Sequence, residues 1–339
     1  MSELRQDRTT GAWTIIAPER WLRPHRPSAG RPAPDHVPRV EPTCPFCPGN
    51  ESRLPGIIAE ARRDEPPGWS VRIVPNKFPA LTPDAAPVPL LPSLHMMISG
   101  YGAHEVVIEH PRHDADLTKM DDGEITAVVE CYHQRFTELA GRSGIETVVL
   151  FRNHGQRGGA SMPHPHAQLI ALGLATPKLR LMAEWACRHY SETGRCPTCE
   201  EIELETKLGE RIVDETRHFL ALVPFAAERP CEVCLVPKRH QGSFAEIAED
   251  ELNDLGILLR QSLQRLEAAH DDPPYNFVIE SAGKSGLGAP HVHWRLRIMP
   301  ELVTAGGFEI GTGMAINPSS PEQDAETLRA LIVFHRGGL

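Results

Sequence analysis

The sequence has no long hydrophobic run. None of its apolar stretches approaches the roughly 18 residues that a membrane-spanning helix requires. The first residues, MSELRQDRTTGAW, also lack the apolar segment of an export signal. We therefore expect a cytoplasmic protein without a membrane partner.

Positive charge is also in deficit. Asp and Glu number 45 against 35 Lys and Arg, which gives a formal net charge of -10 at pH 7. Binding to nucleic acid or to a membrane surface needs a broad basic surface, so we expect neither partner. Local arginines still allow a small anionic ligand. Hydrophobic residues make up 40% of the 339 positions, enough for the cores of two ordinary globular domains.

Six of the eight cysteines form three Cys-x-x-Cys pairs. In a reducing compartment such pairs indicate metal or redox chemistry rather than disulfides. Cys231 and Cys234 differ, because they lie in the apolar stretch CEVCLVP, where strand residues three apart face opposite sides. We interpret these two as core residues, together with Cys131 and Cys187, which lie in helical patterns.

Two stretches of the chain follow one plan, beginning at His104 and at Cys231. Each has a strand that ends in Arg-His, an amphipathic helical pattern (122–139 and 249–268), a second strand, a glycine-rich loop and a His-x-His strand. A shift of 127 positions aligns six residues: Glu105 with Glu232, Val106 with Val233, Arg112 with Arg239, His113 with His240, His164 with His291 and His166 with His293.

This internal repeat predicts the fold class. The order strand, helix, strand, strand indicates an α+β protein with two tandem histidine-triad-like units, each a mostly antiparallel sheet packed with helices. We expect a catalytic unit over residues 1–175 and a second unit over residues 176–339, each with a metal site.

Each copy follows a Cys-Pro-x-Cys knuckle. Two thiolates three residues apart can bind one tetrahedral Zn²⁺, and two imidazoles complete such a site. The two histidine partners are 51 residues apart in both copies. We predict two structural zinc sites, although redox or unligated thiols remain alternatives. The predicted ligands are Cys44, Cys47, His113 and His164 in the first site, and Cys196, Cys199, His240 and His291 in the second.

The second histidine of the motif PHPHAQ has no place in a tetrahedral site that already holds four ligands. His166 is therefore the candidate nucleophile, because a neutral imidazole with one nitrogen held by a hydrogen bond can attack phosphorus with the other. The upstream loop NHGQRGGAS offers backbone N–H groups for phosphate oxygens, with Asn153, Ser161 and Gln168 as further donors. The alternative is that His166 satisfies a polar core.

The second copy lacks these donors. The shift of 127 carries Asn153 to Glu280 and Gln168 to Arg295, and a glutamate beside a phosphate would repel it. We therefore interpret His293 as structural or peripheral.

The chain resembles the galactose-1-phosphate uridylyltransferase family of the histidine-triad superfamily nearly end to end. The motifs that carry the resemblance are ELRQDRTTGAWTIIAPER, CPFCPGNE, VPNKFPAL, SMPHPHAQ and GGFEIGTGMAIN. It implies a homodimer in which His166 becomes covalently nucleotidylated and Gln168 binds the transferred phosphate. It further implies phosphate contacts from Asn153 and Ser161, arginines near the phosphates at Arg20 and Arg23, a nucleotide pocket at Asn76 and Phe78, and a metal site at Cys44, Cys47, His113 and His164.

The late motif departs from the best-known bacterial members, which have Lys, Tyr and Glu that hold the hexose. Here residues 307–313 read GFEIGTG, with Phe308 and Glu309 as the candidate sugar-binding residues. This motif and the second cysteine knuckle look more like other bacterial and archaeal members of the family and like the plant ADP-glucose phosphorylase.

The resemblance implies transfer of a nucleotidyl group from a nucleotide sugar to a sugar 1-phosphate. We predict a ping-pong exchange of UDP-glucose and galactose 1-phosphate for glucose 1-phosphate and UDP-galactose. The alternatives are a phosphorylase that uses inorganic phosphate, such as ADP-glucose phosphorylase, or a transferase for another sugar 1-phosphate. A zinc-stabilised nucleotide-binding module without turnover is the rival from another class.

Overall fold

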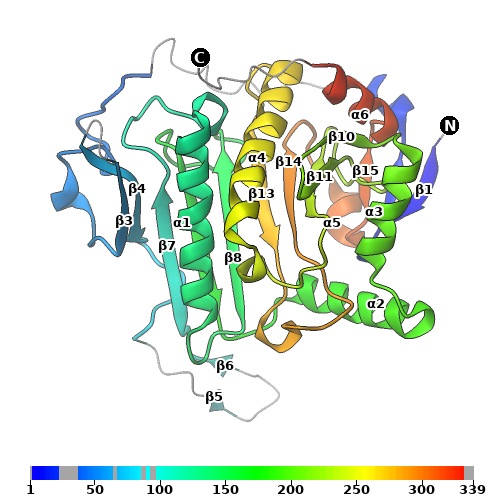
Figure 1. Cartoon of the computed structure of the whole chain (residues 1–339), viewed down its shortest axis with the longest axis horizontal. Helices are drawn as coiled ribbons and strands as arrows, with labels where there is room; N and C mark the ends of the chain where they lie inside the picture. The colour runs from blue at the N-terminus through cyan, green and yellow to red at the C-terminus, as the bar shows by residue number, and fades with distance from the viewer. Residues whose placement is uncertain (1, 23–36, 64–66, 85–88, 92–96, 332–339) are drawn as a thin grey trace.

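The computed structural model describes residues 2–22, 37–63, 67–84, 89–91 and 97–331. Its centre is a ten-stranded sheet in which every neighbouring pair of strands is antiparallel, in the order β10-β11-β12-β14-β13-β8-β9-β7-β4-β3. This arrangement, with helices packed on the sheet, confirms the predicted α+β class (Figure 1).

The two copies form the two halves of this sheet. The first half contains β3 (Ala59–Arg63), β4 (Gly68–Pro75), β7 (Gly102–Ile108), β8 (Thr147–His154) and β9 (His166–Leu172). The second contains β10 (Ile212–Glu215), β11 (Phe219–Leu222), β12 (Val233–Pro237), β13 (Tyr275–Glu280) and β14 (Arg295–Pro300). The halves join where β8 pairs with β13, so one continuous sheet carries both repeats.

Two long helices, α1 (Asp122–Ala140) and α4 (Glu249–His270), lie side by side on one face of the sheet (Figure 1). A capping box at Asp121 begins α1. The Asp121 carboxylate accepts from the backbone N–H of Glu124, and the Glu124 carboxylate accepts from the backbone N–H of Asp121. The helices approach closely at Gly256, where a Cβ would lie 3.4 Å from the carbonyl oxygen of Ile125. The core fills the space between these helices and the sheet.

The alternation of side chains along β9 decides what faces this core. Ala167, Leu169 and Ala171 are fully buried in it. Because neighbouring strand residues point to opposite faces, His166 and Gln168 lie on the other face of the sheet.

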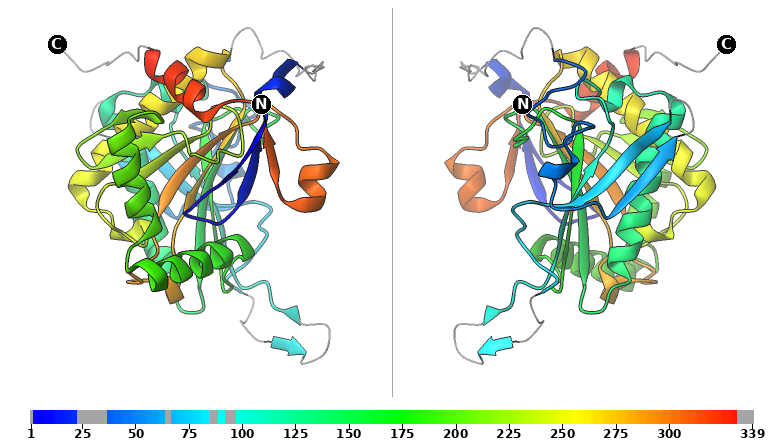
Figure 2. Two further views of the ribbon diagram at one scale, coloured as in Figure 1. Left: turned by 90° about the vertical axis from the view of Figure 1, so that its right-hand side faces the viewer. Right: turned by 90° about the vertical axis from the view of Figure 1, so that its left-hand side faces the viewer.

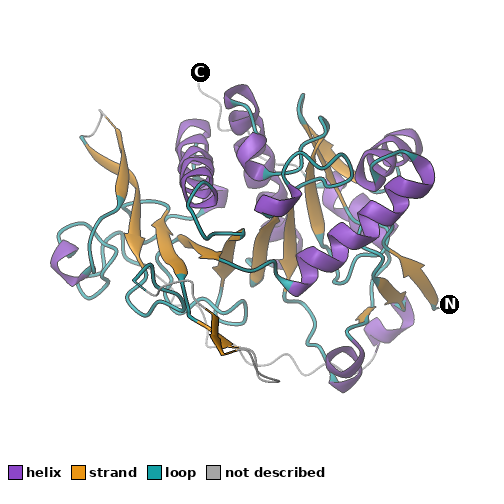
Figure 3. Ribbon diagram, turned by 90° about the horizontal axis from the view of Figure 1, so that it is seen from below, coloured by secondary structure: helices purple, strands orange, loops and turns teal. Residues whose placement is uncertain are grey.

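The remaining elements surround the sheet. They are α2 (Pro177–Thr193), α3 (Pro197–Leu208), α5 (Gly307–Thr312), α6 (Pro321–Ala330), the small sheet of β1 (Glu3–Gln6), β2 (Trp13–Ile16) and β15 (Ala315–Asn317), and the pair β5 (Pro89–Leu91) with β6 (Met97–Ile98). Short 3-10 helices span Pro18–Leu22, Glu51–Arg53, Leu117–Lys119, Phe244–Glu246 and Lys284–Gly286. Figures 2 and 3 show that α5 and the small sheet lie on the opposite side of the large sheet from α1 and α4.

The cysteines predicted as core residues are buried in three of four cases. Cys131, Cys231 and Cys234 are buried, and the last two belong to different hydrophobic clusters, although Cys231 precedes β12 instead of lying on it. The prediction for Cys187 is wrong, because this residue is exposed. It lies on α2, where Ala186 is the buried residue, so most of this helix faces solvent.

The first His-x-His motif spans the start of its strand, and the second lies just before its strand. His164 precedes β9, which begins at His166, and His293 precedes β14, which begins at Arg295. Among the described residues, no helix is long and apolar enough to span a membrane.

Candidate active site and metal-binding clusters

His166 is the first residue of β9 and only 7% exposed. Its Nδ1 lies 2.8 Å from the backbone carbonyl oxygen of His164. Since a carbonyl can only accept, Nδ1 carries the proton and Nε2 keeps its lone pair. Burial lowers the pKa of His166, which favours the neutral imidazole near pH 7. The side chain thus has the tautomer that a nucleophile requires.

Buried groups behind His166 hold this part of the chain in place. The N–H of Glu109 donates to the carbonyl of Pro165 at 3.1 Å, and the Glu109 carboxylate pairs with Arg152 at 3.0 Å. Both charges are almost fully buried. Tyr132 also donates to Glu109, so the residue that supports the His-Pro-His segment is fixed from two sides.

Gln168 lies on the same face as His166, in a small polar group that crosses three neighbouring strands. Its Oε1 lies 2.8 Å from Nε2 of His104 on β7 and 3.3 Å from Nδ2 of Asn76, directly after β4. Asn76 also accepts from the N–H of Phe78 at 2.9 Å. The structure therefore brings the predicted residues Asn76 and Gln168 together. Sequence reasoning missed His104, although its place directly before Glu105 on a predicted strand was visible.

The predicted phosphate-binding loop connects β8 to β9. Asn153 lies near the end of β8, where its side-chain oxygen accepts from Asn276 of β13 at 2.9 Å. Asn276 also donates to the carbonyl of Gly158 at 2.6 Å, which ties the loop to the second half of the sheet. Ser161 is exposed in the same loop. Asn276 carried no signal in the sequence, because only the pairing of β8 with β13 brings it here.

Most of the other predicted binding residues are exposed or lie outside the described residues. Arg20 is exposed on the 3-10 helix Pro18–Leu22, and Arg23 lies outside the described residues. Phe78 is 82% exposed. Phe308 and Glu309 lie on α5 beside the small sheet (Figure 2), and Glu309 accepts from the N–H of Gly306 at 2.9 Å.

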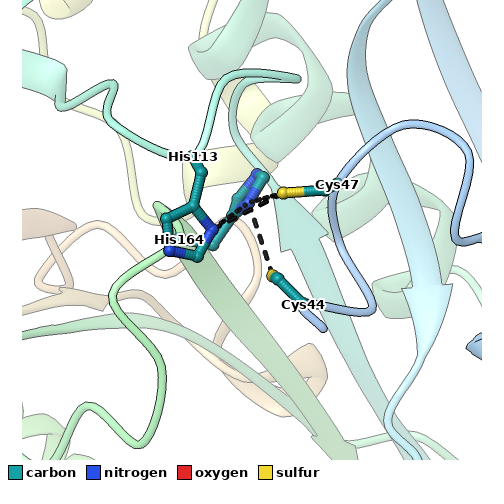
Figure 4. A group of neighbouring side chains, drawn as sticks. All are labelled: Cys44, Cys47, His113 and His164. Carbon is teal, nitrogen blue, oxygen red and sulfur yellow. Dashed lines mark hydrogen bonds between the residues drawn. The ribbon is translucent and has the colours of Figure 1, made fainter. Parts of the chain in front are cut away.

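The first metal-binding cluster consists of Cys44, Cys47, His113 and His164, as predicted, and all four are buried (Figure 4). Nδ1 of His164 lies 3.7 Å from Sγ of Cys44 and 3.6 Å from Sγ of Cys47. The two Nδ1 atoms of His113 and His164 are 3.3 Å apart. The knuckle also reaches His166, because the Phe46 ring contacts the rings of His164 and His166 at 5.8 and 5.5 Å.

The second cluster consists of Cys196, Cys199, His240 and His293. Sγ of Cys199 lies 3.4 Å from Nδ1 of His240 and 3.6 Å from Nδ1 of His293. The prediction of His291 as the fourth ligand is wrong. Its ring lies 6.2 Å from that of Tyr190 on α2, and it meets the cluster only through its carbonyl oxygen, 3.6 Å from Sγ of Cys196.

The reason for this correction is the loop between β13 and β14. Nε2 of His164 is held by the carbonyl of His110 at 2.7 Å, and Nε2 of His293 by the carbonyl of Pro237 at 3.0 Å. Positions 110 and 237 keep the repeat shift of 127, whereas 164 and 293 are 129 apart. Two additional residues in the second loop therefore move the ligand position from His291 to His293.

The strand register agrees with this longer loop. Arg152 pairs with Ala167, and Ile279, 127 positions after Arg152, pairs with Leu296, 129 positions after Ala167. The structural counterpart of His166 is thus Arg295, and that of His164 is His293.

Each set of four donors could hold one metal ion, because the four ligand atoms lie within 4.8 Å of one another. Cysteine and histidine are the donor types that soft and borderline transition metals prefer. Burial raises the pKa of the Cys44 thiol to about 11. Burial therefore disfavours ionisation of this thiol. A coordinated cation would offset that penalty, since thiolate is the form of cysteine that binds metal.

Comparison with known proteins covers almost the whole chain. Residues 1–174 match the N-terminal domain of galactose-1-phosphate uridyl transferase, and residues 183–337 match the C-terminal domain of the same family.

Two curated relatives and one solved structure are similar over nearly their full lengths. The chain is 35% identical to ADP-glucose phosphorylase of Arabidopsis thaliana, over 96% of this chain and 92% of that protein. It is 29% identical to galactose-1-phosphate uridylyltransferase of Thermotoga maritima, over 97% and 98%. The crystal structure of an Arabidopsis thaliana ADP-glucose phosphorylase with bound ADP-glucose has a TM-score of 0.84 at 32% identity, over 98% of this chain and 100% of that chain.

Proposed function

Because the chain belongs to the galactose-1-phosphate uridylyltransferase family, an enzyme family, we propose that it transfers a nucleotidyl group from a nucleotide sugar to a phosphate acceptor through His166. The observation that carries this proposal is the 2.8 Å contact between Nδ1 of His166 and the His164 carbonyl. It leaves the lone pair of Nε2 for attack on phosphorus.

In the first half-reaction, Nε2 of His166 forms a bond to the α-phosphorus of the nucleotide sugar. The bond from this phosphorus to the bridging oxygen breaks, and the sugar 1-phosphate leaves with the electron pair. The product on the enzyme is a nucleotidyl-histidine. In the second half-reaction, an oxygen of the acceptor phosphate attacks the same phosphorus, and Nε2 leaves with the electrons of the P–N bond.

No strong general base is needed for either step, because the acceptor phosphate is already an anion. Positioning and stabilisation of charge on the phosphoryl oxygens supply most of the rate acceleration. We assign this role to Gln168, Asn153, Ser161 and the N–H groups of the β8–β9 loop. Arg20 and Arg23 are proposed to bind the phosphates, and Asn76 and Phe78 the nucleotide.

Two substrate pairs fit this chemistry. UDP-glucose with galactose 1-phosphate follows the reaction named for most of the family. ADP-glucose with inorganic phosphate is the second candidate, and the 35% identity to ADP-glucose phosphorylase, against 29% to the Thermotoga maritima uridylyltransferase, favours it. The late motif supports this pair as well, with Phe308 and Glu309 as the proposed sugar contacts.

We propose that both clusters bind structural Zn²⁺. With Zn–S near 2.3 Å and Zn–N near 2.05 Å, tetrahedral geometry places S and N about 3.6 Å apart and two N atoms about 3.3 Å apart. The observed S···N distances of 3.4 to 3.7 Å and the N···N distance of 3.3 Å fit these values. Four protein ligands complete such a site, so Zn²⁺ would stabilise the fold rather than bind substrate.

The organisation of the enzyme follows from these assignments. We propose that residues 1–175 form the catalytic unit and residues 176–339 a second unit with its own zinc. We also propose a cytoplasmic location, and the family resemblance predicts a homodimer.

Covalent labelling tests the proposed function. Enzyme mixed with a nucleotide sugar and no acceptor should form a phosphoramidate on His166 that is labile to acid and stable to base, and His166→Gly should abolish it. Gln168→Ala should still be labelled, but more slowly. Label on another residue, or a reaction that requires both substrates to be bound together, would overturn the assignment.

A further inference from the structure

Three neighbouring strands bring His104 and Asn76 beside Gln168. On β7, His104 lies two residues before Val106, which pairs with Gln168 of β9. Diagonal neighbours of this kind on an antiparallel pair are within reach of long side chains. Asn76 follows β4, and its backbone N–H donates to the carbonyl of His104 at 2.9 Å. The polar group therefore lies on the face of the sheet that carries His166, two residues before Gln168 on the same strand.

A backbone contact decides the tautomer of His104. The N–H of Ala80 donates to Nδ1 of His104 at 3.1 Å, so Nδ1 must hold a lone pair. A neutral imidazole that accepts at Nδ1 carries its proton on Nε2. Nε2 of His104 lies 2.8 Å from Oε1 of Gln168 and is therefore the donor in that hydrogen bond.

Asn76 is oriented by the backbone as well. Its Oδ1 accepts from the N–H of Phe78 at 2.9 Å, which leaves Nδ2 as the donating end. Nδ2 lies 3.3 Å from Oε1 of Gln168 and 3.1 Å from Nε2 of His104. Because both nitrogens donate, the 3.1 Å separation is that of two donors that share one acceptor. Gln168 must therefore present its oxygen to them, since a reversed amide would bring three donors together.

This orientation leaves the NH₂ group of Gln168 outside the polar group. Within the described part of the chain, no protein atom accepts a hydrogen bond from it. An amide NH₂ donates twice and suits the anionic oxygens of a phosphoryl group, whereas an amide oxygen in its place would repel them. The direction in which the amide is held thus decides whether Gln168 can stabilise the transferred phosphate.

The second half of the sheet has a different arrangement at the same place. Phe151 pairs with Gln168, and Val278, 127 positions after Phe151, pairs with Arg297. Arg297 is therefore the counterpart of Gln168, and its Nε donates to Glu232 at 2.8 Å. A charged pair thus replaces the neutral amide in the half without a candidate nucleophile.

We propose that His104 is a positioning residue for nucleotidyl transfer. It donates through Nε2 to Oε1 of Gln168 and so directs the NH₂ group to the phosphoryl oxygens at His166, with Asn76 as the second donor. This inference rests on the proposed function, because His104 acts only through the role of Gln168.

A double-mutant cycle on the full-length protein tests it. His104→Phe keeps a ring and removes the donor, and the readout is the rate at which His166 is labelled by UDP-glucose or ADP-glucose carrying an α-phosphate label. At a saturating concentration the rate should fall about two- to tenfold. The half-saturating concentration should change little, because the contact acts on charge that develops in the transition state. In a Gln168→Ala background, His104→Phe should change the rate less than twofold.

Two further measurements separate the donor from the shape of the side chain. His104→Gln can place an amide nitrogen near the position of Nε2 and should restore most of the rate that His104→Phe loses. Long-range ¹H–¹⁵N NMR spectra, with the His104 signals assigned from His104→Phe, should show the proton on Nε2.

The outcomes distinguish this inference from the proposed function. With labelling of His166 intact, the role of His104 is overturned by a wild-type rate in His104→Phe, by an equal decrease in both backgrounds, by a failure of His104→Gln to restore the rate, or by a proton on Nδ1. Absence of label on His166 in the wild-type protein would overturn the proposed function and this inference with it.

Discussion

The identity of the fourth ligand in the second cluster can be tested with two neighbouring histidines. His293→Ala removes a donor whose Nδ1 lies 3.6 Å from Sγ of Cys199. His291→Ala removes a ring that lies 6.2 Å from that of Tyr190, tilted by 49°, and is no member of the cluster. Because both changes delete an imidazole within the same loop, His291→Ala is the matched control for His293→Ala.

The expected effect follows from metal binding. With four ligands the site is closed, and with three it is open to water and binds metal more weakly. A metal present at a thousand times its dissociation constant contributes about 4.1 kcal/mol to stability. Purified protein should contain two zinc ions per chain, His291→Ala should keep both, and His293→Ala should retain one after dialysis against a chelator. The free energy of unfolding of His293→Ala should fall by about 4 kcal/mol under metal-replete conditions.

Metal analysis by mass spectrometry and urea denaturation provide the two readouts. The reverse result, loss of zinc in His291→Ala and not in His293→Ala, would refute the argument from loop length. Two zinc ions in both variants would exclude His293 as a ligand, and no zinc in folded wild-type protein would refute both proposed zinc sites.

Three further predictions concern catalysis and stability. The value of kcat/KM should be higher for ADP-glucose with inorganic phosphate than for UDP-glucose with galactose 1-phosphate; the opposite preference would restore the uridylyltransferase reaction as the first choice. Gln168→Ala should lower kcat by about 10²- to 10³-fold if it stabilises the transition state as an oxyanion donor does, and an unchanged kcat would remove it from the site. Burial opposes ionisation of Glu322, but hydrogen bonds from Arg5, Ser320 and Arg211 outweigh it and lower its pKa from 4.5 to about 2. A carboxylate with a lowered pKa stabilises the fold above its unfolded pKa, so stability should be lost as the pH falls from 4.5 to 2. Because Glu322 is partly exposed and its ion pairs are screened by water, we expect a loss of about 1 kcal/mol. Urea denaturation should show a flatter pH dependence for Glu322→Gln over this window, and identical slopes would contradict the assignment.

Much of the candidate site follows from local patterns in the sequence. The spacing of CPFC, His113 and PHPHAQ predicted the four residues of the first cluster and left His166 without a ligand role. The knuckle is a short turn that fixes its two thiolates three residues apart, whereas His113 and His164 are 51 residues apart and were found from their motifs and from the family resemblance. The helices were also predicted from a local pattern, since the apolar period of α1 and α4 reflects the one face that each buries.

The tertiary structure decided what depends on contacts between distant segments. His293 rather than His291 reaches the second cluster, because the carbonyl of Pro237 holds its ring and the loop before it is two residues longer. Asn276 supports the β8–β9 loop only because β13 pairs with β8. Loop length has no periodic signature in a sequence, and strand pairing between two repeats has none either. By itself the sequence therefore determined which chemical groups are available, and the fold determined which of them meet.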